Sequence, residues 1–327
     1  YRSPDFCDHG MSTERNWPRV AVVGAGAVGG YFGGMLARAG APMIMIGRAP
    51  FVDAVKKNGL FLDTVSLKES VRVEASTELK EVSGAEIVLF CVKTIDNAAT
   101  AKELAPLLAP GALVVSMQNG VDNAEQIRAA SGIEALSAVV YVAASVPEPG
   151  RVKHAGRGDL VVGPRSASSE RFAGMCEGAG VGCRISDNIE GELWTKLTWN
   201  CALNAVSAVG RAQYGQIAAS ADARKLVETA VYEILAVARA AGIHPPGFED
   251  PQVALAGAFK IATQLADSYS STAQDMMRGK RTEIDSLNGY IARRGAELGV
   301  PTPVNHALFT LVKLAEGSAV PSAAASS

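Results

Sequence analysis

The segment Val20-Ala-Val-Val-Gly24-Ala-Gly26-Ala-Val-Gly29-Gly30-Tyr31-Phe32 decides the fold. An apolar run typical of a β-strand leads into glycines spaced G-x-G-x-x-G, and a helical pattern follows them. In a dinucleotide-binding fold the first glycine permits the tight turn, the second lets backbone N–H groups approach a pyrophosphate, and the third lets the helix pack on the strand. The alternative is an ordinary glycine-rich turn. We predict a phosphate-binding turn formed by Gly24, Ala25, Gly26, Ala27, Val28 and Gly29.

Further apolar runs with the character of buried strands follow this turn. Residues 42–46 end at Gly47-Arg48, residues 87–92 end at Lys93, and residues 112–117 end at Gln118-Asn119-Gly120. Ligands of open α/β sheets bind beyond the carboxyl ends of the strands. We therefore expect one edge of the sheet to carry the ligand-binding residues Gly24, Arg48, Lys93 and Asn119.

Arg48 stands where an NAD-binding fold typically has an acidic residue that accepts from the ribose hydroxyls. An arginine can instead pair with a 2′-phosphate through two hydrogen bonds. Arg48 therefore predicts NADPH as the cofactor, and the alternative is a solvated surface arginine.

Two segments between these strands, residues 51–59 and 60–75, read as scaffold. Residues 51–59 predict a short helix, and residues 60–75 alternate as a hairpin would. Within residues 142–184, the β patterns at 151–153 and 160–163 predict an antiparallel extension of the sheet. We interpret His154 as a loop or sheet histidine rather than a catalytic base.

Near Ser186 the pattern becomes helical. Asp187 with Glu190 three residues later predicts a helix start, and helices are expected at 189–208, 221–241, 251–277, 281–298 and 303–315. The predicted fold class is α/β, a Rossmann-type doubly wound parallel sheet in residues 19–186 followed by an all-α domain in residues 187–317. Residues 1–18 predict a disordered leader in which Met11 is a candidate start, and residues 318–327 predict a disordered tail.

Composition limits the partners. The 327 residues are 48% hydrophobic with a net charge of −2, and the basic residues are dispersed, which argues against nucleic acid and anionic membranes. No apolar run approaches the ~18 residues of a membrane span, and no signal peptide is evident. The five cysteines lack C-x-x-C spacing, which indicates reduced thiols in a cytoplasmic protein and no metal site. A small-molecule partner is favoured, and the helical domain has apolar surface enough for a homodimer.

One polar stripe interrupts an otherwise apolar helix. Lys196, Asn200 and Asn204 recur every fourth residue among tryptophans and leucines. Burying these groups without partners costs several kcal/mol, so something polar should face them. A ligand would do so. An exposed helix edge, or satisfaction by neighbouring backbone, is the alternative.

A second cluster comprises Ser270-Ser271-Thr-Ala-Gln-Asp275 and Arg278-Gly-Lys-Arg281-Thr-Glu283-Ile-Asp285. Its hydroxyls and carboxylate could anchor a small polar substrate. By itself it also fits an ordinary helix cap followed by a solvated charged turn.

From residue 19 to residue 316 the sequence resembles the ketopantoate reductases (2-dehydropantoate 2-reductases). The resemblance rests on the glycine turn, Cys91-Val-Lys93, Gln118-Asn-Gly120, Glu192-Leu-Trp-Thr-Lys196-Leu with Asn200 and Asn204, Ser270-Ser271 with Gln274-Asp275, and Thr282-Glu-Ile-Asp285 with Asn288-Gly289. It implies an NADP-dependent oxidoreductase acting on CH–OH groups. The implied reaction is the reduction of the ketone of 2-dehydropantoate to (R)-pantoate by NADPH, a step toward pantothenate and coenzyme A.

The resemblance also implies site roles. Lys196 is similar to the family's general acid and Glu283 to its substrate-binding carboxylate, so both are predicted catalytic residues. Asn119, Asn200, Asn204 and Ser271 match substrate-contacting positions, and Arg48, Lys93 and Asn119 are expected on the cofactor side. The chemistry agrees, because an ammonium can stabilise and protonate the alkoxide that hydride transfer creates.

The match is incomplete. Ser268 stands where the family often has asparagine, and Thr272-Ala273 replaces a more typical Met-Leu pair. A paralogous NADPH-dependent reductase of another branched or hydroxylated 2-oxo acid is therefore an alternative. A cofactor-sensing binding protein that performs no chemistry is another.

Overall fold

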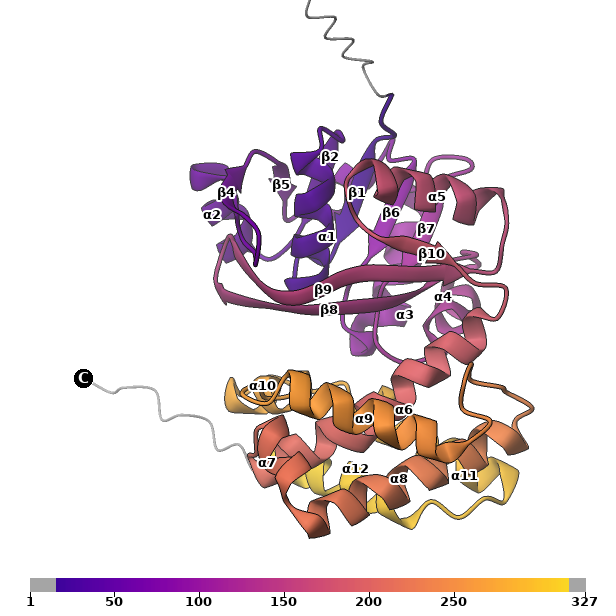
Figure 1. Ribbon diagram of the computed structural model, residues 1–327. Helices are drawn as coiled ribbons and strands as arrows, with labels where there is room; N and C mark the ends of the chain where they lie inside the picture. Colours follow the sequence, from indigo (N-terminus) through magenta and orange to yellow (C-terminus); the bar gives the residue numbers. More distant parts are fainter. Residues whose placement is uncertain (1–15, 318–327) are drawn as a thin grey trace, which may run out of the picture.

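The computed structural model describes residues 16–317, which form two lobes. In the first lobe ten strands build one sheet with the order β4-β3-β9-β8-β7-β6-β1-β2-β5, and β10 lies beside β9 (Figure 1). The strands are β1 Val20–Val23, β2 Met43–Ile46, β3 Leu60–Asp63, β4 Lys68–Val71, β5 Glu74–Ser76, β6 Ile87–Phe90, β7 Leu113–Ser116, β8 Leu136–Glu148, β9 Arg151–Gly163 and β10 Cys183–Ile185.

The centre of the sheet is parallel. β1 pairs with β2 on one side and with β6 on the other, and β6 pairs with β7. The chain passes from β1 to β2 on one side and later returns to β6 on the other, so the strand order reverses at β1. The predicted doubly wound sheet is confirmed, and its carboxyl ends meet at the edge where ligands bind in such folds.

Side chains alternate along the central strands and pack against other elements on both faces of the sheet. Val20 and Val22 of β1 pack into the core beneath α1, whereas Ala21 and Val23 face the core shared with α3 and α4. The helices of this lobe are α1 Ala27–Arg38, α2 Ala49–Asn58, α3 Asn97–Leu104, α4 Asn123–Ser131 and α5 Ala167–Gly178. The central strands are therefore buried on both faces.

The second lobe is helical and is organised around α6, which descends into it from the sheet (Figure 1). Its helices are α6 Ile189–Gly210, α7 Tyr214–Ala219, α8 Ala221–Ala240, α9 Pro251–Gln264, α10 Ser271–Met277, α11 Asn288–Leu298 and α12 Pro303–Gly317. No helix within residues 16–317 combines the length and the apolar character needed to cross a membrane.

Several local predictions were wrong. The helix expected at 251–277 is two helices, because the carbonyls of Ala266 and Ser268 in the intervening loop accept from Gly215 and Tyr214 at 2.9 and 3.0 Å. The helix expected at 281–298 begins only at Asn288, after a short 3₁₀ turn.

The expected cap of α6 was also misplaced. Asn188, not Asp187, accepts from the backbone N–H of Gly191 at 3.0 Å. Helices α5 and α7 were missed. The antiparallel extension is confirmed, but β9 is continuous from Arg151 to Gly163 and pairs with β8 across β-bulges. The predicted tail, and the predicted leader apart from residues 16–18, lie outside the described residues.

Candidate active site

The glycine turn has the geometry that the motif requires. Gly24 adopts φ +100°, and a Cβ there would lie 2.7 Å from the backbone of Cys91 at the end of β6. A Cβ on Gly29 would collide with the carbonyl oxygen of Gly24. At Gly26, by contrast, a Cβ would meet nothing within 4 Å, and this residue is exposed. The turn is closely packed on two sides and open at the N-terminus of α1, so a pyrophosphate fits there.

The structure brings three predicted site residues together at the junction of the lobes. Lys196 Nζ donates to Oδ1 of Asn119 at 2.9 Å. Nδ2 of Asn119 donates in turn to Oε2 of Glu283 at 3.0 Å. The ammonium, the amide and the carboxylate therefore form one continuous hydrogen-bonded chain.

A buried network of amides and a backbone turn position Asn119. Gln118 precedes it and donates to Oδ1 of Asn97 at 2.8 Å and to the carbonyl of Val92 at 3.0 Å. The Asn123 side chain donates to the carbonyl of Asn119 at 2.7 Å, and Gly120 turns the chain with φ +97°. The end of β7 is thus fixed, so the side chain of Asn119 has a defined direction.

Glu283 reaches the sheet because it lies in an irregular segment. It immediately precedes the 3₁₀ turn Ile284–Ser286, and its Oε1 accepts from the backbone N–H of Thr94 at 3.2 Å. Thr94 was not predicted as a site residue. Its buried hydroxyl has no hydrogen-bond partner within residues 16–317.

The position of Lys196 tunes its acidity. Burial disfavours the charged ammonium and lowers the pKa of Lys196 to about 8, although nearby Glu283 raises it and Arg157 lowers it further. The ordinary value for lysine is ~10.4. A lysine whose pKa lies near neutral pH can both hold a proton and release it, as a general acid must.

Lys93 also joins the lobes. Its Nζ donates to Oδ2 of Asp275 at 2.8 Å and to the carbonyl of Arg281 at 2.7 Å. The sequence allowed the cluster that contains Asp275 either to anchor a substrate or to form a solvated turn, and in the structure the Asp275 carboxylate pairs with Lys93. Nothing in the position of Asp275 along the sequence indicated this partner, since 182 positions separate the two residues.

The remaining predicted residues are placed as follows. Asn200 lies half-buried on α6, one turn after Lys196. Asn204 is buried, and its Oδ1 accepts from the Tyr214 hydroxyl at 3.0 Å, so the deeper part of the stripe is satisfied by the protein itself.

Ser271 is exposed in the first turn of α10, and Arg48 is exposed at the N-cap of α2. His154 stacks on Tyr31 with ring centroids 4.3 Å apart, as a sheet histidine would.

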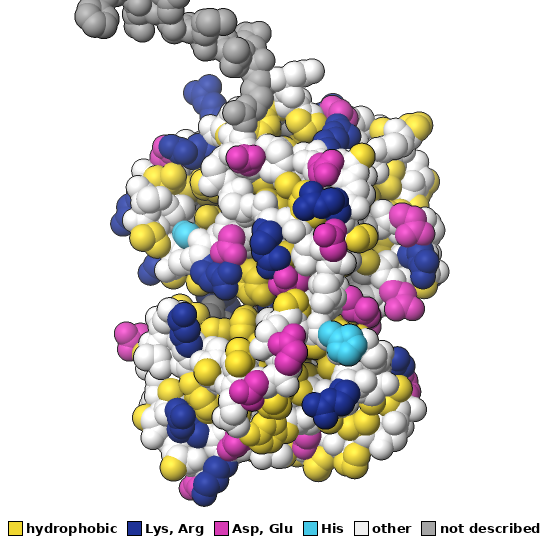
Figure 2. Space-filling model, turned by 45° about the vertical axis from the view of Figure 1, so that its right-hand side comes forward, with side chains coloured by type: hydrophobic (Ala, Val, Ile, Leu, Met, Phe, Trp, Pro, Cys, Tyr) yellow, Lys and Arg dark blue, Asp and Glu magenta, His cyan; other side chains and the backbone are white. Residues whose placement is uncertain are grey.

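The junction is visible on the surface. Figure 2 shows an indentation between the two lobes, and on this face acidic and basic side chains are interspersed rather than gathered by sign.

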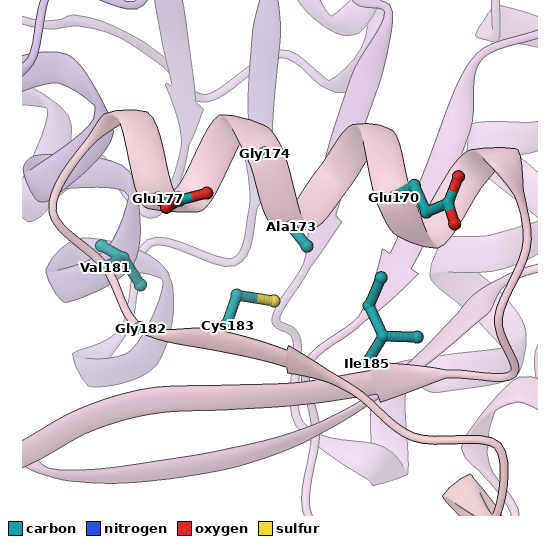
Figure 3. A pocket seen from close by; sticks show the side chains of 8 residues that line it. All are labelled: Glu170, Ala173, Gly174, Glu177, Val181, Gly182, Cys183 and Ile185. Atoms are coloured by element: carbon teal, nitrogen blue, oxygen red, sulfur yellow. The ribbon is translucent and has the colours of Figure 1, made fainter.

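A groove of about 500 Å³ between α5 and β10 is lined by none of the predicted site residues (Figure 3). Within residues 16–317 there is also no group of three or more His, Cys, Asp or Glu side chains able to hold a metal ion.

Comparison with known proteins gives a consistent assignment. Residues 20–167 match the family model described as "Ketopantoate reductase PanE/ApbA", and residues 188–316 match the model of the C-terminal part of the same family. Together the two matches cover most of the chain.

Curated relatives and a solved structure agree with the family models. The chain is 30% identical over 300 residues to a 2-dehydropantoate 2-reductase of Pyrococcus abyssi, covering 90% of this chain and 97% of the relative. It is 31% identical over 299 residues to one of Archaeoglobus fulgidus, with coverage of 90% and 97%. A PanE/ApbA family ketopantoate reductase from Ralstonia eutropha superimposes with a TM-score of 0.86 at 46% identity, covering 91% of this chain and 98% of that one.

Proposed function

Because the chain belongs to the ketopantoate reductase family, we propose that it uses NADPH to reduce the ketone of 2-dehydropantoate to (R)-pantoate, with Lys196 as the general acid. Enzymes of this family are oxidoreductases that act on CH–OH groups. They use a nicotinamide cofactor, and their substrate is a small 2-oxo acid. The named relatives favour 2-dehydropantoate over other 2-oxo acids and favour an enzyme over a sensor.

The hydrogen-bonded chain at the lobe junction supports the proposed chemistry. A bound reduced nicotinamide supplies the hydride. Lys196 Nζ stabilises the negative charge that develops on the former carbonyl oxygen and then gives that oxygen its proton. Asn119 orients the ammonium through its 2.9 Å hydrogen bond, and the carboxylate of Glu283 raises the pKa of Lys196, which keeps the acid protonated. Water then returns the lost proton.

The residues at the sheet edge fit the cofactor. The turn from Gly24 to Gly29 and the N-terminus of α1 would hold the pyrophosphate. Arg48, exposed just after β2, would pair with the 2′-phosphate and select NADPH. Lys93, which follows β6, would contact the cofactor. Its ammonium would then give up the hydrogen bond that it donates to Asp275.

Substrate binding is assigned to the surrounding polar side chains. Asn200 lies one helical turn beyond Lys196, and Asn204 lies one turn further. Ser271 and Glu283 come from α10 and the segment that follows it. Glu283 would bind a hydroxyl of the substrate, and Asn119 would contact both substrate and cofactor.

One observation carries this assignment, namely the hydrogen bond from Lys196 to Asn119. A steady-state assay of the purified protein, with NADPH consumption as the readout and a panel of branched and hydroxylated 2-oxo acids, tests it. We expect kcat/KM of ~10⁴ M⁻¹s⁻¹ or more for 2-dehydropantoate, with the other acids far below. Turnover of 2-dehydropantoate no better than that of unrelated 2-oxo acids would reject the function.

We further propose a cytoplasmic homodimer. Large apolar side chains remain exposed on the helical lobe, including Val253, Met277 and Leu311. Sedimentation of the purified protein at several concentrations would test the oligomeric state, and a monomer at all of them would reject the dimer.

A further inference from the structure

Two cysteines of the first lobe lie on neighbouring elements. Cys176 is on α5 and Cys183 is on β10, and a tight connection joins these elements. The backbone N–H of Val181 donates to the carbonyl of Cys176 at 2.9 Å, which folds the chain back under the helix. Side chains two residues apart on an extended segment share a face, so Cys183 points to the same side as Val181. Figure 3 shows the Cys183 side chain on the side of β10 that faces α5.

This arrangement places the two side chains on facing sides of α5 and β10. Cys176 is 2% exposed in the core of the first lobe, and Cys183 packs against that core. The two thiols are within hydrogen-bonding reach of each other. The absence of a C-x-x-C motif concealed the pair, because the turn between α5 and β10, rather than local spacing, brings it together.

The two thiols differ in access and in acidity. Cys183 lines the groove of about 500 Å³ between α5 and β10, together with the carboxylates Glu170 and Glu177 (Figure 3). A hydrogen bond from Cys176 lowers the pKa of Cys183, and the same contact together with burial raises the pKa of Cys176. Cys183 is therefore both the reachable thiol and the more readily ionised one, which makes it the nucleophile of the pair.

We propose that Cys176 and Cys183 form a redox modification site that reacts with small cationic or neutral disulfides and closes to an intramolecular disulfide. The Cys183 thiolate attacks one sulfur of the reagent, and the reagent's other half leaves as a thiolate. That thiolate takes the proton of Cys176. The Cys176 sulfur then attacks Cys183, forming the protein disulfide and releasing the second thiol. The protein loses two electrons and two protons, and the reagent becomes two thiols.

The place of the pair in the fold suits reversible chemistry. Disulfides in reducing compartments are usually transient rather than structural. β10 pairs with β9 and ends four residues before α6 begins, and Arg184 of β10 binds Glu192 of α6 at 2.8 Å. The bond would therefore tie α5 to the strand that leads into the helix carrying Lys196.

Peptide mapping after oxidation tests the proposal. The full chain with Cys7→Ser would be treated with cystamine, quenched in acid, alkylated under denaturing conditions and digested. We expect a Cys176–Cys183 cross-link, a chain lighter by two hydrogen atoms, alkylated Cys91 and Cys201, and full reversal by dithiothreitol. The two control cysteines are suitable because both are free and packed within their own lobes.

Two variants and a second reagent sharpen the test. Cys176→Ala should stop at a stable cysteamine adduct on Cys183, and Cys183→Ser should slow modification of Cys176 at least ~10-fold. Glutathione disulfide, an anion, should react several-fold more slowly than cystamine at low salt because the carboxylate of Glu177 lines the groove, whereas that of Glu170 is paired with Arg165 at 3.4 Å. The proposal would be overturned if the cysteamine adduct on the parent chain never converted to the Cys176–Cys183 disulfide. It would also be overturned if Cys91 and Cys201 were modified as fast as Cys183. Mapping of the parent chain decides the matter even if a variant fails to fold.

Discussion

The ammonium of Lys196 and the side-chain oxygen of Asn119 lie 2.9 Å apart although 77 positions separate them in the chain. Lys196 belongs to the long helix of the helical lobe, and Asn119 follows a central strand of the sheet. The proposed acid is thus oriented by the other lobe.

Replacing Lys196 with alanine tests its role directly. We expect kcat to fall by ~10²–10⁴, because the developing alkoxide loses its proton donor. NADPH binding, measured by fluorescence titration, should change little. Lys225→Ala is the matched control, since that lysine is exposed on α8 and pairs only weakly with Asp222 at 3.7 Å. Equal turnover by the two variants would contradict the assignment.

The pH dependence of the reaction reports the acidity of Lys196. Burial lowers the pKa of this lysine to about 8, and reduction requires the protonated form. The rate of ketone reduction should therefore be constant below that value and fall about tenfold per pH unit above it. The rate of pantoate oxidation, which needs the neutral amine of Lys196, should instead rise with pH up to that value and be constant above it. A reductive rate that stays flat up to pH ~10, near the ordinary lysine pKa, would argue against Lys196 as the acid.

Glu283→Gln should separate binding from acidity. The carboxylate raises the pKa of Lys196, so removing its charge should shift the descending limb of the pH profile to lower pH. It should also raise KM for the 2-oxo acid. Glu297→Gln, on an exposed glutamate of α11, serves as the control. If the reductive rate of the variant began to fall at the same pH as that of the parent, Glu283 would not act on Lys196 through its charge.

Cofactor choice depends on Arg48. Arg48→Ala should raise KM for NADPH by at least ~10-fold while leaving NADH nearly unaffected, because only NADPH has the 2′-phosphate that a guanidinium pairs with. Lys57→Ala, on the same helix α2, controls for a general loss of positive charge. Parallel losses with both cofactors would remove Arg48 from the specificity site.

Glu233 is expected to stabilise the helical lobe. Its buried carboxylate accepts from the backbone N–H groups of Val304 and Asn305 at 2.9 Å each and from Nδ2 of Asn305 at 2.8 Å. Glu233→Ala strands these buried donors and should lower the free energy of unfolding by ~2–3 kcal/mol. Urea denaturation measures the loss. Glu228→Ala, at a half-buried position of α8 where the carboxylate accepts only from the Tyr232 hydroxyl at 3.0 Å, should cost less than ~1 kcal/mol, and a similar loss for both would refute the role.

The parts of the fold that were predictable are those with strong local signals. The glycine turn, the central strands and the helices α6, α8 and α12 follow from hydrophobic periodicity and turn chemistry, and the structure has them. The break between α9 and α10 was not predictable in this way. It depends on loop carbonyls that pair with α7, a tertiary contact that no local pattern encodes.

The same distinction holds at the site. Lys196, Asn119 and Glu283 could be named from their motifs, but their mutual hydrogen bonds depend on how the lobes pack. Asn204 illustrates the limit, because helical spacing placed it in the polar stripe but did not reveal that Tyr214 satisfies it. Thr94 was missed because its contribution is a backbone N–H, which every non-proline residue has.

The division of the reaction centre between two lobes also constrains recombination. A chimera that joins the sheet of one reductase to the helices of another would inherit a complete set of functional side chains. It would still misplace the ammonium whenever the borrowed interface shifted by about 1 Å, and such a shift alone can cost ~10²-fold in rate. The two halves must therefore change together, and the interface between them is as much a determinant of turnover as any single side chain.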